Sequence, residues 1–175
     1  MKKLILFTAC VLIMGLSGML FAQDNDNHDV TLVVNSIAEI AVSADVSLTV
    51  TAPTTPGGIP QDDSDNSAYL RYTSTVPASW TRNVTAAWGA GNAAPAGTQL
   101  RLQASPQSGK GTSAGQVTVS SSAQNIVTAI SSCFTGTGGS DGAQLAYALE
   151  VTDATALVAT ESKTVTVTFT MTDAS

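Results

Sequence analysis

The chain has 175 residues, of which 7 are Lys or Arg, 13 are Asp or Glu and one is His. Its first 22 residues are typical of a removable export signal, and the remaining 153 residues carry five basic against 13 acidic side chains, a net charge of −8. This length fits one domain whose core needs neither a disulfide nor a metal. The acidic balance argues against nucleic acid as a partner, because phosphate binding needs clustered Lys and Arg.

The amino terminus has the three parts of a bacterial-type secretory signal. Lys2 and Lys3 are positive, residues 4–14 are almost entirely apolar, and residues 15–22 are rich in small side chains. We therefore expect cleavage after Ala22, export to the periplasm, the extracellular space or the cell surface, and no membrane span in the mature chain. The alternative is an uncleaved anchor, because the 19 residues from Leu4 to Ala22 could just cross a bilayer.

The mature chain is predicted to consist of an amino-terminal extension or first strand (residues 23–34) followed by one β-domain (residues 35–175). Val30, Leu32 and Val34 alternate with polar or smaller neighbours, and the same even phase of apolar residues continues from 40 to 50. A single strand over residues 30–50 would be about 70 Å long, far beyond a normal strand. We expect a break near Asn35–Ser36 or Ala44–Asp45.

The same period-two alternation continues through the rest of the chain and predicts short strands separated by Gly- and Pro-rich turns. On the strand from Trp80 to Trp88 we expect Trp80, Val84, Ala86 and Trp88 on one face. The pattern between Ser121 and Ser132 also fits one face of a helix. The expected strands are residues 68–76, 80–88, 99–104, 116–120, 125–134, 143–151 and 163–172. The predicted fold is all-β: a single antiparallel immunoglobulin-like or jelly-roll-type β-sandwich of about eight to ten strands.

Acidic residues cluster between Asp62 and Asp65, where Asp63, Asp65 and Ser67 alternate as calcium ligands do in loop sites. A loop of the EF-hand type needs Gly at its sixth position and Glu at its twelfth, and Ala68 and Ser74 stand there instead. We therefore expect an ordinary solvated loop and no metal.

No set of residues in the sequence points to catalysis or to a cofactor. Cys133 is the single cysteine after signal removal, and His28 lies far from it in the sequence, so no thiol–imidazole pair is expected. We interpret Cys133 as a buried small hydrophobic residue beside Phe134, with an intermolecular disulfide as the alternative. The expected function is non-enzymatic, and no cofactor is predicted.

Three aromatic residues are candidates for stacking on a sugar: Tyr69, Trp80 and Trp88. Trp88 is in phase with Val84 and Ala86, which favours a place in the core, whereas Tyr69 is out of phase with its neighbours and favours exposure. The alternative function is therefore a carbohydrate-binding or adhesin module with a glycan or surface partner. A further alternative is an isopeptide-stapled surface domain, which would use Lys110 or Lys163.

The two ends of the chain carry a resemblance to a known family. The run from Lys163 to Thr172 (KTVTVTFTMT) resembles the terminal strand of bacterial fimbrial (pilin) subunits, and residues 23–34 resemble their amino-terminal donor extensions. The resemblance implies self-assembly through edge strands, in which the extension of one subunit completes the sandwich of the next. Val30, Leu32 and Val34 would then fill the pockets. A self-contained sandwich whose first strand closes its own sheet predicts the same alternation.

Overall fold

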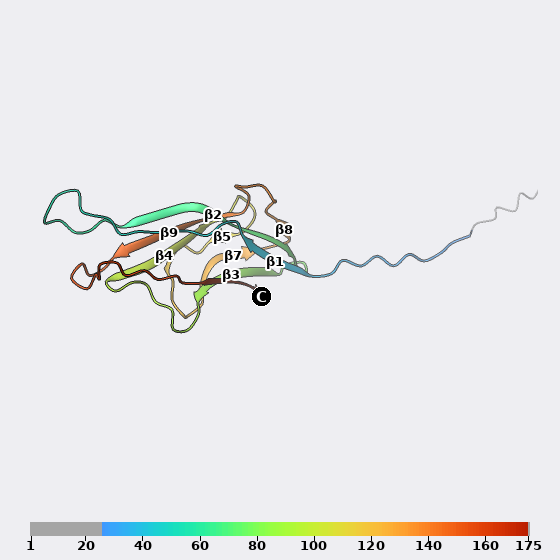
Figure 1. The fold of residues 1–175 in the computed structure, drawn as a ribbon. Coiled ribbons are helices and arrows are strands. Elements are labelled where there is room, and N and C mark those ends of the chain that lie inside the picture. Colours follow the sequence, from blue (N-terminus) through green and yellow to red (C-terminus); the bar gives the residue numbers. More distant parts are fainter. Residues whose placement is uncertain (1–25, 175) are drawn as a thin grey trace, which may run out of the picture. The chain divides into compact units, whose positions relative to one another are not determined.

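A computed structural model describes residues 26–174, so the expected signal segment lies outside the described residues. Residues 26–33 contain no helix or strand, and a compact unit begins at Val34. Figure 1 shows that this unit consists of two layers of β-strands. Its ten strands pair antiparallel, and no helix occurs between residues 26 and 174. The expected all-β sandwich and its number of strands are therefore confirmed.

The first sheet has the order β1-β2-β9-β4-β6, and β8 also pairs with β2. Its strands are β1 (Ile37–Val42), β2 (Asp63–Thr75), β9 (Ala143–Val151), β4 (Thr98–Ser105), β6 (Gln116–Thr118) and β8 (Cys133–Phe134). The second sheet has the order β10-β3-β7-β5. Its strands are β10 (Val167–Ala174), β3 (Thr81–Trp88), β7 (Gln124–Ile130) and β5 (Thr112–Ser113). Each sheet thus has one long edge strand, β1 or β10, and one short edge strand, β6 or β5.

The core forms because alternate side chains of the central strands point into the space between the sheets. Burial alternates residue by residue along β4 and β9, as expected for strands with one face in the core. The largest fully buried apolar side chains come from both sheets: Leu70, Leu102, Leu145, Val84, Val119, Ile126, Val127 and Ile130.

One continuous segment, residues 111–119, joins the two sheets along one side of the sandwich, which we call the closed side. Its β5 part pairs with β7, and its β6 part pairs with β4 in the other sheet. Val119 is fully buried, and its N–H donates to the carbonyl of Leu100 at 2.9 Å. A Cβ on Gly111 would lie 2.8 Å from Cγ1 of Val127, so glycine lets this segment pack tightly on the core.

The strand pairings also define two poles of the sandwich. We call the expected amino-terminal extension, residues 23–34, the leader, and the end of the sandwich at which β1 begins the leader pole. At the leader pole, Ile37 of β1 pairs with Thr75 of β2, and Ala174 of β10 pairs with Thr81 of β3. At the far pole, Val167 of β10 pairs with Trp88 of β3. The residues that precede β1 therefore join the compact unit at the leader pole.

The structure bears on two expectations in the amino-terminal half. Residues 30–34, for which the sequence allowed an extension or a first strand, form no strand, and β1 begins at Ile37, just after the expected break near Asn35–Ser36. Trp80 precedes β3 and ends a tight turn, in which its N–H donates to the carbonyl of Pro77 at 3.1 Å.

Two further segments differ from the sequence-based expectation or resolve it. Residues 63–67, expected to lie in a solvated loop, belong to β2 and pair in part with β9. The pairing shifts register between Asp65 and Ala68, which explains why the alternation there is hard to detect. The ambiguous segment from Ser121 to Ser132 contains strand β7 and no helix.

Candidate functional site: the open side of the sandwich

The side of the sandwich opposite the closed side is bordered by β1, residues 43–50 that follow it, Val165 and β10; we call it the open side. Here β1 pairs only with β2, and β10 pairs only with β3. The two edge strands belong to different sheets and contact each other. Each therefore presents one row of backbone N–H and C=O groups that no other described strand pairs with.

The apolar side chains along β10 are only half-buried. Val167, Phe169 and Met171 occupy successive inward positions and pack against the core, while Thr168, Thr170 and Thr172 point outward and are exposed. Val165, just before the strand, continues the inward row. The alternation is that of a strand with one face in the core, but this core is covered incompletely.

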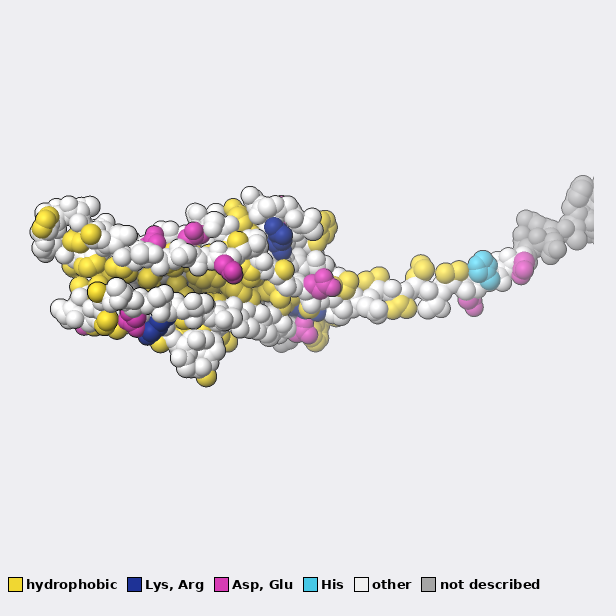
Figure 2. All heavy atoms as spheres, viewed as in Figure 1, with side chains coloured by type: hydrophobic (Ala, Val, Ile, Leu, Met, Phe, Trp, Pro, Cys, Tyr) yellow, Lys and Arg dark blue, Asp and Glu magenta, His cyan; other side chains and the backbone are white. Residues whose placement is uncertain are grey.

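The opposite border of the open side shows the same incomplete burial. Ile40 on β1 and then Val46 and Leu48 are half-buried against the core. After β1 the chain follows β2 through few bonds, including Ser43 N–H to Tyr69 O at 2.9 Å and Thr49 N–H to Asp63 Oδ2 at 2.7 Å. Figure 2 shows a band of hydrophobic side chains between the two layers on the face that is viewed.

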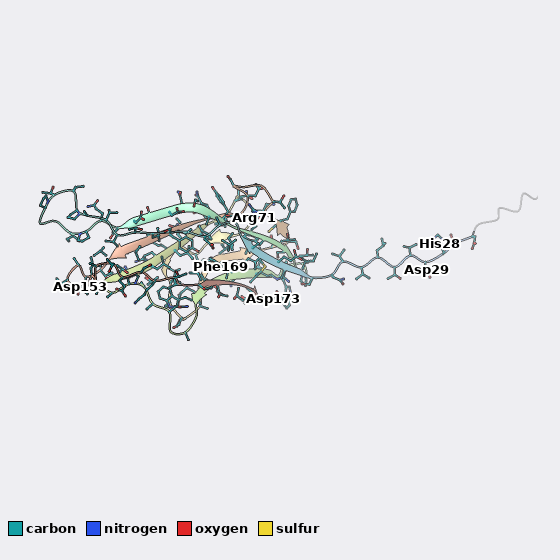
Figure 3. All side chains as sticks on the ribbon, viewed as in Figure 1. His28, Asp29, Arg71, Asp153, Phe169 and Asp173 are labelled. Carbon is teal, nitrogen blue, oxygen red and sulfur yellow. The ribbon has the colours of Figure 1, made fainter. Side chains whose placement is uncertain are left out.

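Polar side chains close the leader pole of the open side. The Arg82 guanidinium, whose side chain is 5% exposed, donates from Nε to Asp173 Oδ1 at 2.7 Å. It also donates from Nη2 to Ser36 Oγ at 2.7 Å and from Nη1 to the carbonyl of Ile37. Weaker bonds join it to Ser74 Oγ and the carbonyl of Thr75. We call Ser36, Ser74, Arg82 and Asp173 the polar end layer; Asp173 is labelled in Figure 3.

Arg82 is the residue of this site that sequence reasoning missed. The expected inward face of the strand contained Trp80 and Val84 but passed over the residue between them. Arg82 is in phase with Val84 and Ala86 and is buried with them, whereas Trp80 lies outside the strand. A cation at an inward position of an alternating strand was the signal that could have revealed a buried ion pair.

The predicted donor positions lie in the leader and at its junction with the compact unit. Val30, Leu32 and Val34 are 66%, 88% and 84% exposed, and none of them belongs to a strand. Exposed, alternating, large apolar side chains of this kind are typical of a segment that can pair as a strand with another chain.

The three candidate sugar-stacking aromatics are not brought together. Trp88 is partly buried against the core, as its phase predicted. Tyr69 faces outward from β2, and its hydroxyl accepts a long bond from Gln144 Nε2 at 3.4 Å. Trp80 is 48% exposed in the turn at the leader pole, at the opposite end of β3 from Trp88. These residues therefore form no common platform.

The acidic cluster binds protein groups in the structure. Asp62 accepts from Val151 N–H at 2.7 Å, and Asp63 accepts from Thr49 N–H and Ser64 N–H. Asp65 accepts from the hydroxyl and the N–H of Ser67, which lowers the pKa of its carboxyl. Among residues 26–174, no three His, Cys, Asp or Glu side chains are grouped so as to hold a metal ion.

A shallow depression of about 380 Å³ lies beside β8 and includes Cys133, Phe134 and Lys110. Phe134 is 69% exposed, with Lys110 Nζ 4.9 Å from its ring centre, whereas Cys133, expected to be buried, is half-buried and packs against the core. Burial raises the pKa of the Cys133 thiol, and Lys110 partly opposes this. Phe134 stays exposed because β8 has only two residues and pairs only with β2.

The two lysines considered for an isopeptide have other neighbours. Lys163 Nζ lies 2.8 Å from Glu161 Oε1, and Lys110 lies over the Phe134 ring.

Comparison of the chain with protein-family models, with curated proteins and with solved structures finds no significant match. Within residues 26–174, the structure contains no helix that is long and apolar enough to cross a membrane.

Proposed function

We propose that this chain is an exported, non-catalytic structural subunit of a surface filament that assembles by strand complementation. The leader of one copy, through Val30, Leu32 and Val34, adds a strand to the open side of another copy, between β1 and β10. The observation that carries the proposal is the pair of long unpaired edges whose inward apolar side chains are only half-buried.

The energetics favour occupation of the open side. An added strand pairs its backbone with a free edge and places alternate side chains on the incompletely covered core. Burying an aliphatic side chain stabilises by about 1.5–3 kcal/mol, so three such residues contribute several kcal/mol, in addition to the burial of Val167, Phe169 and Met171. The ordering of the leader opposes this gain.

The direction of the added strand decides what is built. If the leader runs antiparallel to β10, its own compact unit lies beyond the far pole of the acceptor, because each leader joins its unit at the leader pole. That contact is head-to-tail and repeats without closing, which gives a filament. A leader parallel to β10 would bring two leader poles together and favour a closed, exchanged dimer. Antiparallel pairing is the more stable of the two.

The proposal is tested with the mature chain, residues 23–175, by light scattering and sedimentation over a range of concentrations. We expect polymers of many lengths for the wild-type chain. Leu32→Asp should remain monomeric, because a carboxylate cannot enter the apolar row, and it leaves folding intact because Leu32 is 88% exposed.

The matched control is Thr31→Asp, which introduces the same charge at a neighbouring exposed position with an outward side chain in the added strand. It should still polymerise. A wild-type chain that stays a monomer at every concentration, or a Leu32→Asp chain that polymerises as well as Thr31→Asp, would contradict the proposal. A closed dimer would refute the filament and retain strand exchange.

A further inference from the structure

We propose that the polar end layer is an end-stop that sets the register of the incoming leader. Val30, Leu32 and Val34 then lie opposite Met171, Phe169 and Val167 of β10, respectively, and His28 lies opposite Asp173. This inference rests on the proposed function, and it adds a positioning role for Arg82, a residue that does not itself belong to either of the pairing strands.

The inward row of each strand changes from apolar to polar at the leader pole. On β10 the row runs Val167, Phe169, Met171 and then Asp173. On β3 it runs from Ala86 and Val84 to Arg82, and on β2 it ends at Ser74 after Leu70 and Tyr72. The apolar part of the open side therefore ends at one level, next to Met171.

Arg82 fills the space between the two edges at that level. Its guanidinium bonds to Asp173 on β10, to Ser36 just before β1 and to the carbonyl of Ile37 on β1. These bonds join the two sheets across the open side. An apolar side chain of an incoming strand that reached this level would displace hydrogen-bonded groups or leave them without water or partners, which is costly.

The inward row of the leader also changes from apolar to polar, between Val30 and His28. Upstream of Val30, the residues with the same phase are His28 and Asp26, so the apolar row of the leader ends where the polar part begins. In the proposed register every apolar leader position faces an apolar position of β10, and His28 can donate to the Asp173 carboxylate, whose side chain is 63% exposed. A shift of two residues toward the leader pole would place Val30 against Asp173. The opposite shift would place His28 against Met171.

The register is measured by cross-linking outward residues. Thr31 of the leader is paired with each of three exposed threonines of β10 in separate double-cysteine chains, all with Cys133→Ser: Thr168, Thr170 and Thr172. A disulfide needs Cβ atoms about 3.5–4.5 Å apart, so it reports residues that lie directly opposite one another. We expect the chain with Thr31→Cys and Thr170→Cys to form a ladder of disulfide-linked oligomers under mild oxidation. The amount of cross-linked product should be at least tenfold higher than for either of the other two pairs.

Two variants test whether the polar match sets the register. His28→Val gives the leader a fourth inward apolar position. If the leader then shifts by two residues along β10, its four apolar positions all lie opposite apolar residues: Val165, Val167, Phe169 and Met171. The ladder should move from the Thr170 pair to the Thr168 pair. The matched control Asp29→Val alters an outward position and should leave the ladder at Thr170.

Arg82→Met removes the end-stop and should move part of the ladder to the Thr172 pair, and Arg82→Lys should restore part of the Thr170 preference. If Arg82→Met does not fold, the His28→Val result decides, because the leader variant leaves the compact unit unchanged. A change in unfolding midpoint without a change in cross-linking partner would mean that Arg82 has a structural role only, and would overturn its positioning role.

The outcomes separate the two proposals. No ladder at any of the three pairs, or only a cross-linked monomer, refutes pairing between copies and thus the proposed function. A ladder strongest at Thr168 or Thr172 in the chain with native His28 and Arg82 retains strand complementation and refutes this register. A ladder at Thr170 that His28→Val leaves in place refutes the end-stop.

Discussion

The closed side and the open side of this sandwich are both lined by apolar side chains and differ in what covers them. On the closed side, one segment crosses from β5 to β6, and Val119, Val127 and Ile130 are fully buried. On the open side, no described strand crosses, and Val167, Phe169 and Met171 stay half-buried. The difference shows that the core of this unit is complete only along one side.

The difference also shows where an intermolecular strand would be most effective. Both short edges, β5 and β6, are joined to each other through Gly115 and present only five strand residues in all. The long edges β1 and β10 together present 14 strand residues. Protected, short edges discourage pairing with another chain, and long free edges permit it.

The largest effect is expected on the free energy of unfolding, when a side chain of the complete core and one of the open side are each replaced by alanine. Both variants are made in the monomeric Leu32→Asp chain. Ile126→Ala should cost about 2–5 kcal/mol of unfolding free energy, because its side chain is fully buried. Phe169→Ala should cost less, about 1–2 kcal/mol in the monomer, since its side chain is only partly buried there. Urea unfolding measures both, and equal costs would mean that the open side is covered in the monomer.

Loss of the polar end layer should have the next largest effect. Arg82→Met removes a buried guanidinium that joins β3, β10 and β1, and we expect a loss of about 3 kcal/mol in the same urea measurement. Asp173→Asn should cost less than about 1 kcal/mol, because the amide oxygen still accepts from Arg82 and the side chain is largely exposed. Similar losses for the two variants would show that the ion pair, and not the bonds to β1, holds the layer together.

A third effect concerns the stability of the fold at alkaline pH, where two buried tyrosines of the first sheet become important. Burial raises the pKa of Tyr147 to about 12 and also raises that of Tyr72. Because these phenols lose their protons more readily in the unfolded chain, stability should be fully present below pH 10 and fall as the pH rises from 10 to 12. The loss attributable to Tyr147 is about 2–3 kcal/mol. Thermal melts of Tyr147→Phe at pH 7 and pH 11 should show a smaller alkaline loss than the wild-type chain.

The smallest effect is expected at the far pole. The side-chain bond from Lys163 and the backbone N–H of Ala96 lower the pKa of Glu161. A carboxyl whose pKa is lowered on folding stabilises the folded state at pH values above its ordinary pKa of 4.5. This stabilisation is lost as the pH falls through the pKa of the folded state. Glu161→Gln should therefore leave the melting temperature at pH 7 nearly unchanged and slightly flatten its decrease below pH 4.5. A large loss at pH 7 would contradict this small contribution of Glu161 to stability.

Strand alternation could predict much of this fold because the central strands each have one face in the core. Residues 143–151 form β9 as expected, and the pattern around Leu70 and Val84 identifies core strands. The alternation could not reveal that residues 30–34 form no strand here, because an apolar–polar period predicts the ability to pair and says nothing about which neighbour is present.

The candidate site was predictable only on the donor side. Val30, Leu32 and Val34 stand out in the sequence, but the two acceptor edges are defined by sheet order, which depends on pairings between residues far apart in the chain, such as Ile37 with Thr75 and Arg82 with Asp173. Arg82 was missed because a search for apolar periodicity discards a cation at an inward position, even though a buried ion pair occupies such a position well.

Strand complementation at β10 is tested most directly by amide hydrogen exchange in the assembled chain and in the monomeric Leu32→Asp chain. We expect alternate N–H groups between Val167 and Met171, which face the free edge in the monomer, to become at least a hundredfold more protected in the assembly, together with residues 30–34 of the leader. Polymers in which β10 and the leader exchange as fast as in the monomer would show that the copies associate elsewhere and would rule out strand complementation.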